Sequence, residues 1–127
     1  DEFNSQNIAN TVWAFATAGV AAPALFDAIA AEALSRLRDF KSQELANTVW
    51  AYATAGVVVP ALFEAIAREA LSQLRDFTQQ NIANTVWAFA TAGVAAPALF
   101  DAIAAEALSR LRDFKSQELA NTVWAYA

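Results

Sequence analysis

A repeat of 37 residues runs through the chain and constrains its fold more than any other feature. Aligned on itself, the 127-residue sequence divides into units 3–39, 40–76 and 77–113, followed by the first half of a fourth, 114–127. A period of 20 to 50 residues is typical of arrays in which each unit stacks on its neighbours. We therefore interpret residues 1–127 as a single repeat array, and as a fragment of a longer one.

The residue pattern of each unit predicts two helices. The first covers residues 5–18, where apolar side chains recur at helical spacing and amides occupy the opposite arc. The second begins at a proline, which suits the first helical position, and runs to about residue 37. Glycine fits the left-handed position after the first helix. The prolines are Pro23, Pro60 and Pro97, the glycines are Gly19, Gly56 and Gly93, and the N-caps expected are Asn4 or Ser5, Ser42 and Thr78.

The short loop inside each unit predicts an antiparallel helical hairpin. One hairpin is too small to bury Trp13, Phe15, Phe26 and Leu34 by itself, so neighbouring hairpins must stack. The predicted fold is all-α, an α-solenoid of stacked antiparallel helical hairpins with a 37-residue repeat.

The composition excludes several classes of protein. The chain has no His and no Cys, which removes the commonest general base, the commonest metal ligand and any thiol nucleophile. It also lacks a glycine-rich phosphate loop. We therefore expect no enzyme activity, no catalytic residue, no metal and no cofactor. The net charge of −5 disfavours binding to nucleic acid by long-range electrostatics alone.

Two uncharged runs, 3–26 and 77–100, raise the question of a membrane span. Each contains several Asn and Gln residues, with a glycine and a proline near its end. A spanning helix would have to place those amides in hydrocarbon. We predict that the chain does not span a membrane.

One asparagine recurs in the middle of the polar arc of every first helix. Asparagine is unfavourable inside a helix, so a compensating interaction is expected. Its amide offers both a donor and an acceptor, which suits hydrogen bonding to base edges. The alternative is a ladder of amides that joins neighbouring first helices. The candidate binding residues are Asn10, Asn47, Asn84 and Asn121.

A second polar position alternates between Asn and Glu from unit to unit, one turn earlier on the same face. Different bases could be preferred at the two kinds of unit, because a carboxylate accepts from an amino group. The competing interpretation is a favourable charge near the helix N-terminus. These candidate residues are Asn7, Glu44, Asn81 and Glu118.

Two further residue types invite both a functional and a structural interpretation. Trp13, Trp50, Trp87 and Trp124 lie at the edge of the apolar arc, where they could stack on bases or pack between hairpins. One arginine per unit lies after each second helix, and these arginines could contact phosphates or simply complement the helix dipole. They are Arg38, Arg75 and Arg112.

The run FNSQNIANTVWAFA, followed by Gly19 and by PALF from Pro23, resembles the octotricopeptide repeat over the whole chain. These repeats are helical hairpins of 38 residues in algal organelle proteins, with similar 37-residue repeats in apicomplexans. The proline-rich stretch of that family is only partly present. The resemblance implies sequence-guided binding of single-stranded RNA along the first helices, in a chloroplast or mitochondrion.

The sequence thus supports two functions. The first is an organellar RNA-binding protein that contacts single-stranded RNA through the polar face of each first helix. The second is a protein-binding scaffold, such as a structural subunit of a large organelle complex, because an acidic, alanine-rich surface also suits a protein partner.

Overall fold

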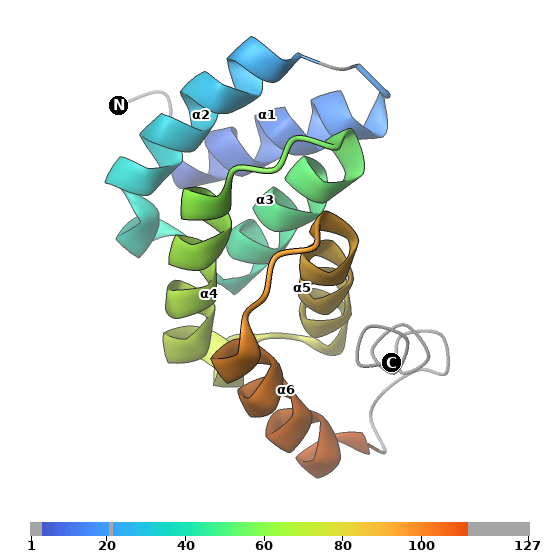
Figure 1. The fold of residues 1–127 in the computed structure, drawn as a ribbon. Coiled ribbons are helices and arrows are strands. Elements are labelled where there is room, and N and C mark those ends of the chain that lie inside the picture. Colours follow the sequence, from blue (N-terminus) through green and yellow to red (C-terminus); the bar gives the residue numbers. More distant parts are fainter. Residues whose placement is uncertain (1–3, 21, 112–127) are drawn as a thin grey trace.

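The structure is a computed structural model that describes residues 4–20 and 22–111 (Figure 1). This part of the chain is helical and contains no strand, which confirms the predicted all-α class. Equivalent helices begin 37 residues apart, at Ser5, Ser42 and Gln79. The elements are α1 (Ser5–Thr17), α2 (Pro23–Ser35), η1 (Leu37–Asp39), α3 (Ser42–Ala55), α4 (Pro60–Gln73), η2 (Leu74–Asp76), α5 (Gln79–Ala92) and α6 (Pro97–Ser109).

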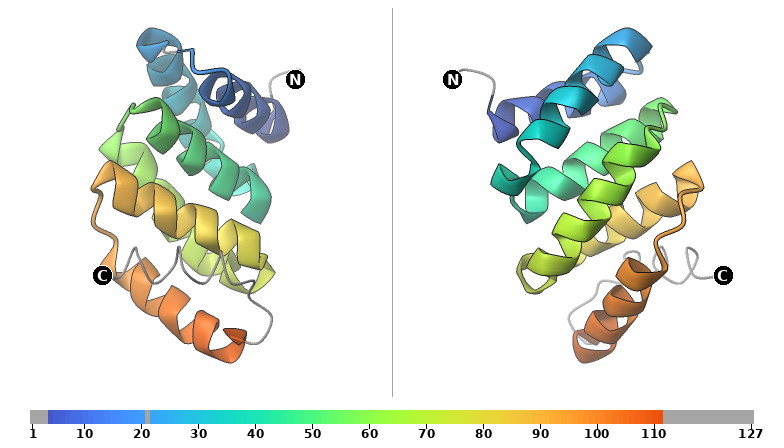
Figure 2. Two further views of the ribbon diagram at one scale, coloured as in Figure 1. Left: turned by 90° about the vertical axis from the view of Figure 1, so that its right-hand side faces the viewer. Right: turned by 60° about the vertical axis from the view of Figure 1, so that its left-hand side comes forward.

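The helices form two layers (Figure 2). The first helix of each unit lies in one layer, where α3 packs between α1 and α5. The second helices α2, α4 and α6 form the other layer and contact one another less extensively. The layer of first helices is therefore the more tightly packed of the two.

The predicted helix ends are confirmed. Gly19, Gly56 and Gly93 have φ values of 72°, 74° and 72°, in the left-handed region that glycine adopts without a steric penalty. At the end of α3 the Val57 amide donates to the Tyr52 carbonyl at 3.0 Å, and the Gly56 amide donates to the Ala53 carbonyl at 3.2 Å. These two bonds satisfy carbonyls that the helix end leaves free.

The helix starts differ from unit to unit. The side chains of Asn4 and Thr78 accept hydrogen bonds from the Asn7 and Asn81 amides, at 2.9 and 3.0 Å, and so act as the predicted N-caps. The prediction for Ser42 is wrong, because Lys41 occupies the N-cap position of α3. The Ser42 hydroxyl donates to the Asp76 carbonyl, at the end of the same unit, at 3.3 Å.

Thr78 and Lys41 occupy equivalent N-cap positions, so replacing each one measures how much a capping side chain stabilises the helix. We expect Thr78→Ala to lower the free energy of unfolding by about 1 kcal/mol, because an amide of α5 loses its acceptor. Lys41→Ala should change it by less than about 0.5 kcal/mol, since lysine has no acceptor to lose. Urea denaturation followed by circular dichroism measures both, and equal losses would contradict the assignment of the cap.

Aromatic rings join the two layers across successive units. The ring of Phe26 on α2 meets Tyr52 on α3 edge to face at 4.9 Å, and Phe63 on α4 meets Phe89 on α5 in the same way at 5.3 Å. All four side chains are buried. The helices α2 and α4 are therefore each anchored to the first helix of the following unit, which interlocks the described hairpins.

Tyr52 is a buried polar residue in this core. Its hydroxyl donates to the Phe26 carbonyl at 2.5 Å, which supplies the partner that a buried hydroxyl needs. Burial, and secondarily the negative charge of Asp27, raise the pKa of the Tyr52 hydroxyl above its usual value near 10. The folded protein therefore favours the neutral phenol.

We expect Tyr52→Phe to lower the free energy of unfolding by about 0.5–1.5 kcal/mol at neutral pH, through the lost hydrogen bond. Phenylalanine fits the site, because Phe89 occupies the equivalent position in the next unit. The stability that the raised pKa provides is complete below about pH 10 and falls as the pH rises further. Urea denaturation at about pH 8 and about pH 11 should show a smaller difference between the two proteins at the higher pH.

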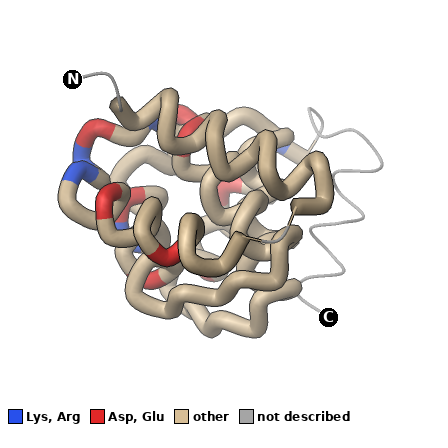
Figure 3. Tube along the Cα trace, turned by 90° about the horizontal axis from the view of Figure 1, so that it is seen from above, with Lys and Arg blue, Asp and Glu red and all other residues tan. Residues whose placement is uncertain are grey.

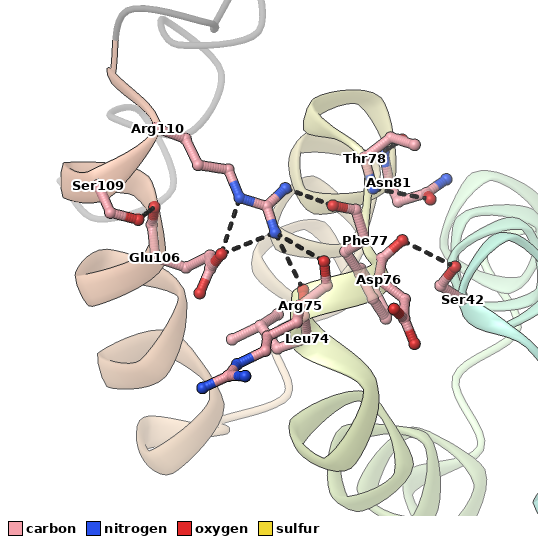
Figure 4. A network of polar contacts seen from close by, with 10 residues as sticks. All are labelled: Ser42, Leu74, Arg75, Asp76, Phe77, Thr78, Asn81, Glu106, Ser109 and Arg110. Atoms are coloured by element: carbon pink, nitrogen blue, oxygen red, sulfur yellow. Dashed lines mark hydrogen bonds and ion pairs between the residues drawn. The ribbon is translucent and has the colours of Figure 1, made fainter.

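Polar contacts tie the ends of α4 and α6 to the starts of their own units, and Figure 4 shows those of α6. Arg110 binds Glu106 at 2.7 Å and donates to the carbonyls of Phe77, Leu74 and Arg75. Gln73, at the equivalent position one unit earlier, donates to the Phe40 carbonyl at 2.8 Å. Glutamine in unit two and arginine in unit three thus donate to the same carbonyl position.

In the part of the chain that the structure describes, no helix combines the length and the apolar character that crossing a bilayer requires.

Candidate nucleic-acid interface

The exposed face of the first-helix layer carries the same four residues in each unit. In α3, Gln43, Asn47, Trp50 and Thr54 follow one another at spacings of four, three and four residues, so they lie on one side of the helix. None of the four is buried, and the same holds in α1 and α5. We call this surface the amide–Trp stripe. Its residues are Gln6, Asn10, Trp13, Thr17, Gln43, Asn47, Trp50, Thr54, Gln80, Asn84, Trp87 and Thr91.

The predicted polar arc of the first helix is in fact divided. Thr48 and Ala51 of α3 and the equivalent Thr85 and Ala88 of α5 are buried. Their small size lets neighbouring first helices approach closely. The buried hydroxyls remain satisfied, since Thr48 donates to the Glu44 carbonyl at 2.7 Å and Thr85 to the Asn81 carbonyl at 2.8 Å. Only half of the predicted polar face is therefore available to a ligand.

The predicted asparagines fall on the available half. Asn10 is exposed, and Asn47 and Asn84 are half-buried within the stripe. Gln80 donates to the Asn84 amide oxygen at 3.0 Å, so the two amides lie together one turn apart. Asn121 lies outside the described residues.

The second predicted set occupies the N-terminal turn of each first helix. The amide oxygens of Asn7 and Asn81 accept from the backbone N–H groups of Asn4 and Thr78, at 3.3 and 3.1 Å. A Glu44 carboxylate oxygen accepts from the Lys41 backbone N–H and from the Ser5 hydroxyl, both at 3.0 Å. These oxygens complete capping interactions, a structural role different from the charge effect that the sequence suggested.

This capping role leaves the alternating position little capacity for a ligand. Asn81 is only 7% exposed, and Glu44 also links α3 to the preceding unit through Ser5. Base recognition at Asn7, Glu44 and Asn81 stays a prediction. Glu118 lies outside the described residues.

The tryptophans form a ladder across the stripe. The ring centroids of Trp13 and Trp50 lie 6.4 Å apart with planes inclined at 32°, and those of Trp50 and Trp87 lie 6.4 Å apart at 33°. These distances are within the range of favourable aromatic pairs. Trp13 is 45% exposed, and the other two are partly buried. The rings therefore join neighbouring first helices and also present aromatic surface to solvent.

The first helices are almost free of charge. Glu44 is the one charged residue within α1, α3 and α5. Figure 3 marks the charged residues of the described chain, which fall on the second helices, the turns between units and the start of α3. The stripe can thus bind through hydrogen bonds and stacking, and offers no cation to a phosphate.

The predicted arginines belong to the other layer. Arg38 and Arg75 are exposed on η1 and η2, each followed by an aspartate. Arg38 lines a surface hollow of about 550 Å³ with Arg36 and Arg68, and Arg75 lines the equivalent hollow of about 500 Å³ one unit later. No stripe residue lines either hollow. Arg112 lies outside the described residues.

Sequence reasoning placed Gln6 and Thr17 on the same polar arc as Asn10 but did not name them, or their equivalents, as candidate binding residues. The signal was present, because residues at positions i, i+4, i+7 and i+11 share one side of a helix.

The described residues also contain no group of three acidic side chains that could hold a metal ion.

Comparison with known proteins identifies the family of this chain. The profile of the family described as RNA-editing substrate-binding complex 6 protein matches residues 1–127, the whole chain. The chain belongs to this family. No curated protein matches the sequence. The family is consistent with the helical structure, and it does not bear on the resemblance to octotricopeptide repeats specifically.

Proposed function

We propose that the chain is a non-catalytic subunit of an RNA-editing complex and that its amide–Trp stripe binds single-stranded RNA. The observation that carries the proposal is the stripe itself, which repeats the same amides and indole on three neighbouring helices. The family's name links its members to a complex that binds an editing substrate.

The chemistry of the stripe suits unpaired bases. Amide groups such as those of Gln80 and Asn84 offer donors and acceptors to base edges, and indoles such as Trp50 offer a surface for stacking. Stacking of this kind tolerates any base. These groups hold and orient a ligand, whereas acid–base chemistry would need ionisable groups that the stripe does not carry.

The proposed architecture is an α-solenoid with a 37-residue repeat, similar to octotricopeptide arrays. Two observations support it: equivalent helices start 37 residues apart, and the first two hairpins each pack on the next through an equivalent aromatic contact. In such an array each new unit adds one set of Gln, Asn, Trp and Thr residues to the binding surface.

We propose a mitochondrial location for the chain. The support comes from RNA-editing complexes of kinetoplastids, which are mitochondrial. A chloroplast location has no comparable support.

A scaffold that binds protein subunits of the editing complex is the second candidate. The observation that favours it is the charge pattern, since the chain carries a net charge of −5 and the stripe has no cation. Nucleic-acid binding usually draws much of its affinity from phosphate contacts.

The test measures binding of the full chain to single-stranded RNA by filter retention, with homopolymers and a random-sequence pool. The test variant replaces the stripe asparagines Asn10, Asn47 and Asn84, together with Asn121 at the equivalent sequence position, with alanine. The matched control replaces Ser35, Ser72 and Ser109 with alanine, because these exposed serines of the second helices bond only local carbonyls.

We expect the unmodified chain to bind RNA. The affinity of the asparagine variant should be lower by about tenfold or more, while its circular dichroism spectrum is unchanged. The serine control should bind as the unmodified chain does. Equal weakening in both variants, or no binding by the unmodified chain, would reject the RNA function in favour of the scaffold.

A further inference from the structure

We infer that the amide–Trp stripe prefers an RNA tract of one repeated base and holds it through its bases rather than its phosphates. This inference rests on the proposed RNA-binding function and deepens it by naming the class of RNA. It follows from three features of the described residues: the identity of the stripe in each unit, its repeated geometry and its lack of cations.

The stripe does not vary between units. Glutamine, asparagine, tryptophan and threonine occupy the same four positions in α1, α3 and α5. The first helices of units one and two do differ elsewhere, at the residue pairs Asn7/Glu44, Ile8/Leu45 and Phe15/Tyr52. The first pair caps its helix, and the other two pairs pack against the core. Variation therefore falls on caps and core and leaves the stripe constant.

The geometry repeats as closely as the sequence. The two tryptophan pairs have the same centroid distance of 6.4 Å and interplanar angles of 32° and 33°. The glycines that end the three first helices have φ values within 2° of one another. Successive units therefore present their ring faces at the same spacing and inclination, on helices that carry the same amide residues.

A surface with one repeated set of contacts cannot favour different bases at successive units. Discrimination requires differential hydrogen bonding, as between asparagine and a residue of another type. If the amide of Asn47 favours one base, the amides of Asn10 and Asn84 favour the same base. The ligand that satisfies every unit at once is a homopolymeric tract.

The charge distribution determines how this tract is held. The first helices contain no Lys or Arg, and the nearest cation along the chain is Lys41, directly before α3. Each phosphate contact to a single strand contributes a slope of about −0.7 to the dependence of log K on log salt concentration. Among the described residues Lys41 could supply one such contact, so binding should depend weakly on salt.

The experiment titrates the full 127-residue chain with RNA oligonucleotides and follows quenching of tryptophan fluorescence. The probes are rA, rC and rU homopolymers of about 12 nucleotides and a mixed-sequence strand of equal length, within the site sizes seen for single-strand binders. Each titration is repeated at several salt concentrations. A variant with Asn47→Gln and Asn84→Gln keeps the amides but moves them, and so tests base preference with little change to the fold.

We expect one homopolymer to bind about tenfold tighter than the mixed strand, with a salt slope shallower than about −1. The glutamine variant should lose the preference and keep the shallow slope. Equal affinity for all four strands, or a slope steeper than about −2, would overturn the inference while leaving RNA binding in place. Absence of binding to every strand would overturn the proposed function itself.

Discussion

Phe63→Ala should lower the free energy of unfolding by about 3–5 kcal/mol, the largest effect expected of any single replacement here. The Phe63 ring is fully buried and meets Phe89 edge to face at 5.3 Å, across the boundary between units two and three. Its removal costs both the transfer of the ring from water and the cavity that remains. The loss should therefore weaken the joint between hairpins as well as the local core.

Leu71→Ala is the matched control for this replacement. Leu71 lies on the same helix, α4, but is 39% exposed, so its truncation should cost less than about 1 kcal/mol. Urea denaturation of both variants, followed by circular dichroism, gives the comparison. Similar losses in the two proteins would contradict the interlocking of hairpins through Phe63.

Trp50→Ala should weaken RNA binding about 5- to 150-fold, the range that follows from the loss of one stacked base. Trp50 is the middle ring of the ladder and contacts both Trp13 and Trp87. Its removal interrupts the aromatic surface at its centre. Trp50→Phe should retain part of the affinity, because the smaller ring still offers a face for stacking.

The measurement for Trp50 is filter binding of labelled RNA, with circular dichroism as a check that the variant folds. Leu71→Ala again serves as the control, since it removes an exposed apolar side chain from the opposite layer. Full affinity in folded Trp50→Ala protein would show that the ladder only joins the helices.

Much of the fold was predictable because its signals are local. Gly19 and Pro23 mark the end of one helix and the start of the next through backbone preferences that do not depend on the rest of the chain. The N-cap of α3 was not predictable in this way. Ser42 is a good capping residue, yet it occupies the first turn, where its hydroxyl bonds the carbonyl of Asp76 at the end of the same unit.

The candidate site was predictable only in part, because exposure depends on neighbouring units. Helical spacing placed Asn47 and Thr48 together on a polar arc, and the structure buries Thr48 against an adjacent first helix while leaving Asn47 at the surface. A helical wheel cannot show where a second helix of the same layer will lie. For the same reason the sequence left open whether Trp50 is packed or exposed, and it is partly both.

Photo-cross-linking of the full chain to single-stranded RNA, with mass spectrometry of the attached peptides, tests the central claim most directly. We predict cross-links on the first helices, at Trp50, Trp87 and their neighbours in the stripe. Cross-links confined to the hollows around Arg38 and Arg75 on the opposite layer would contradict the account, as would a complete absence of cross-linked RNA.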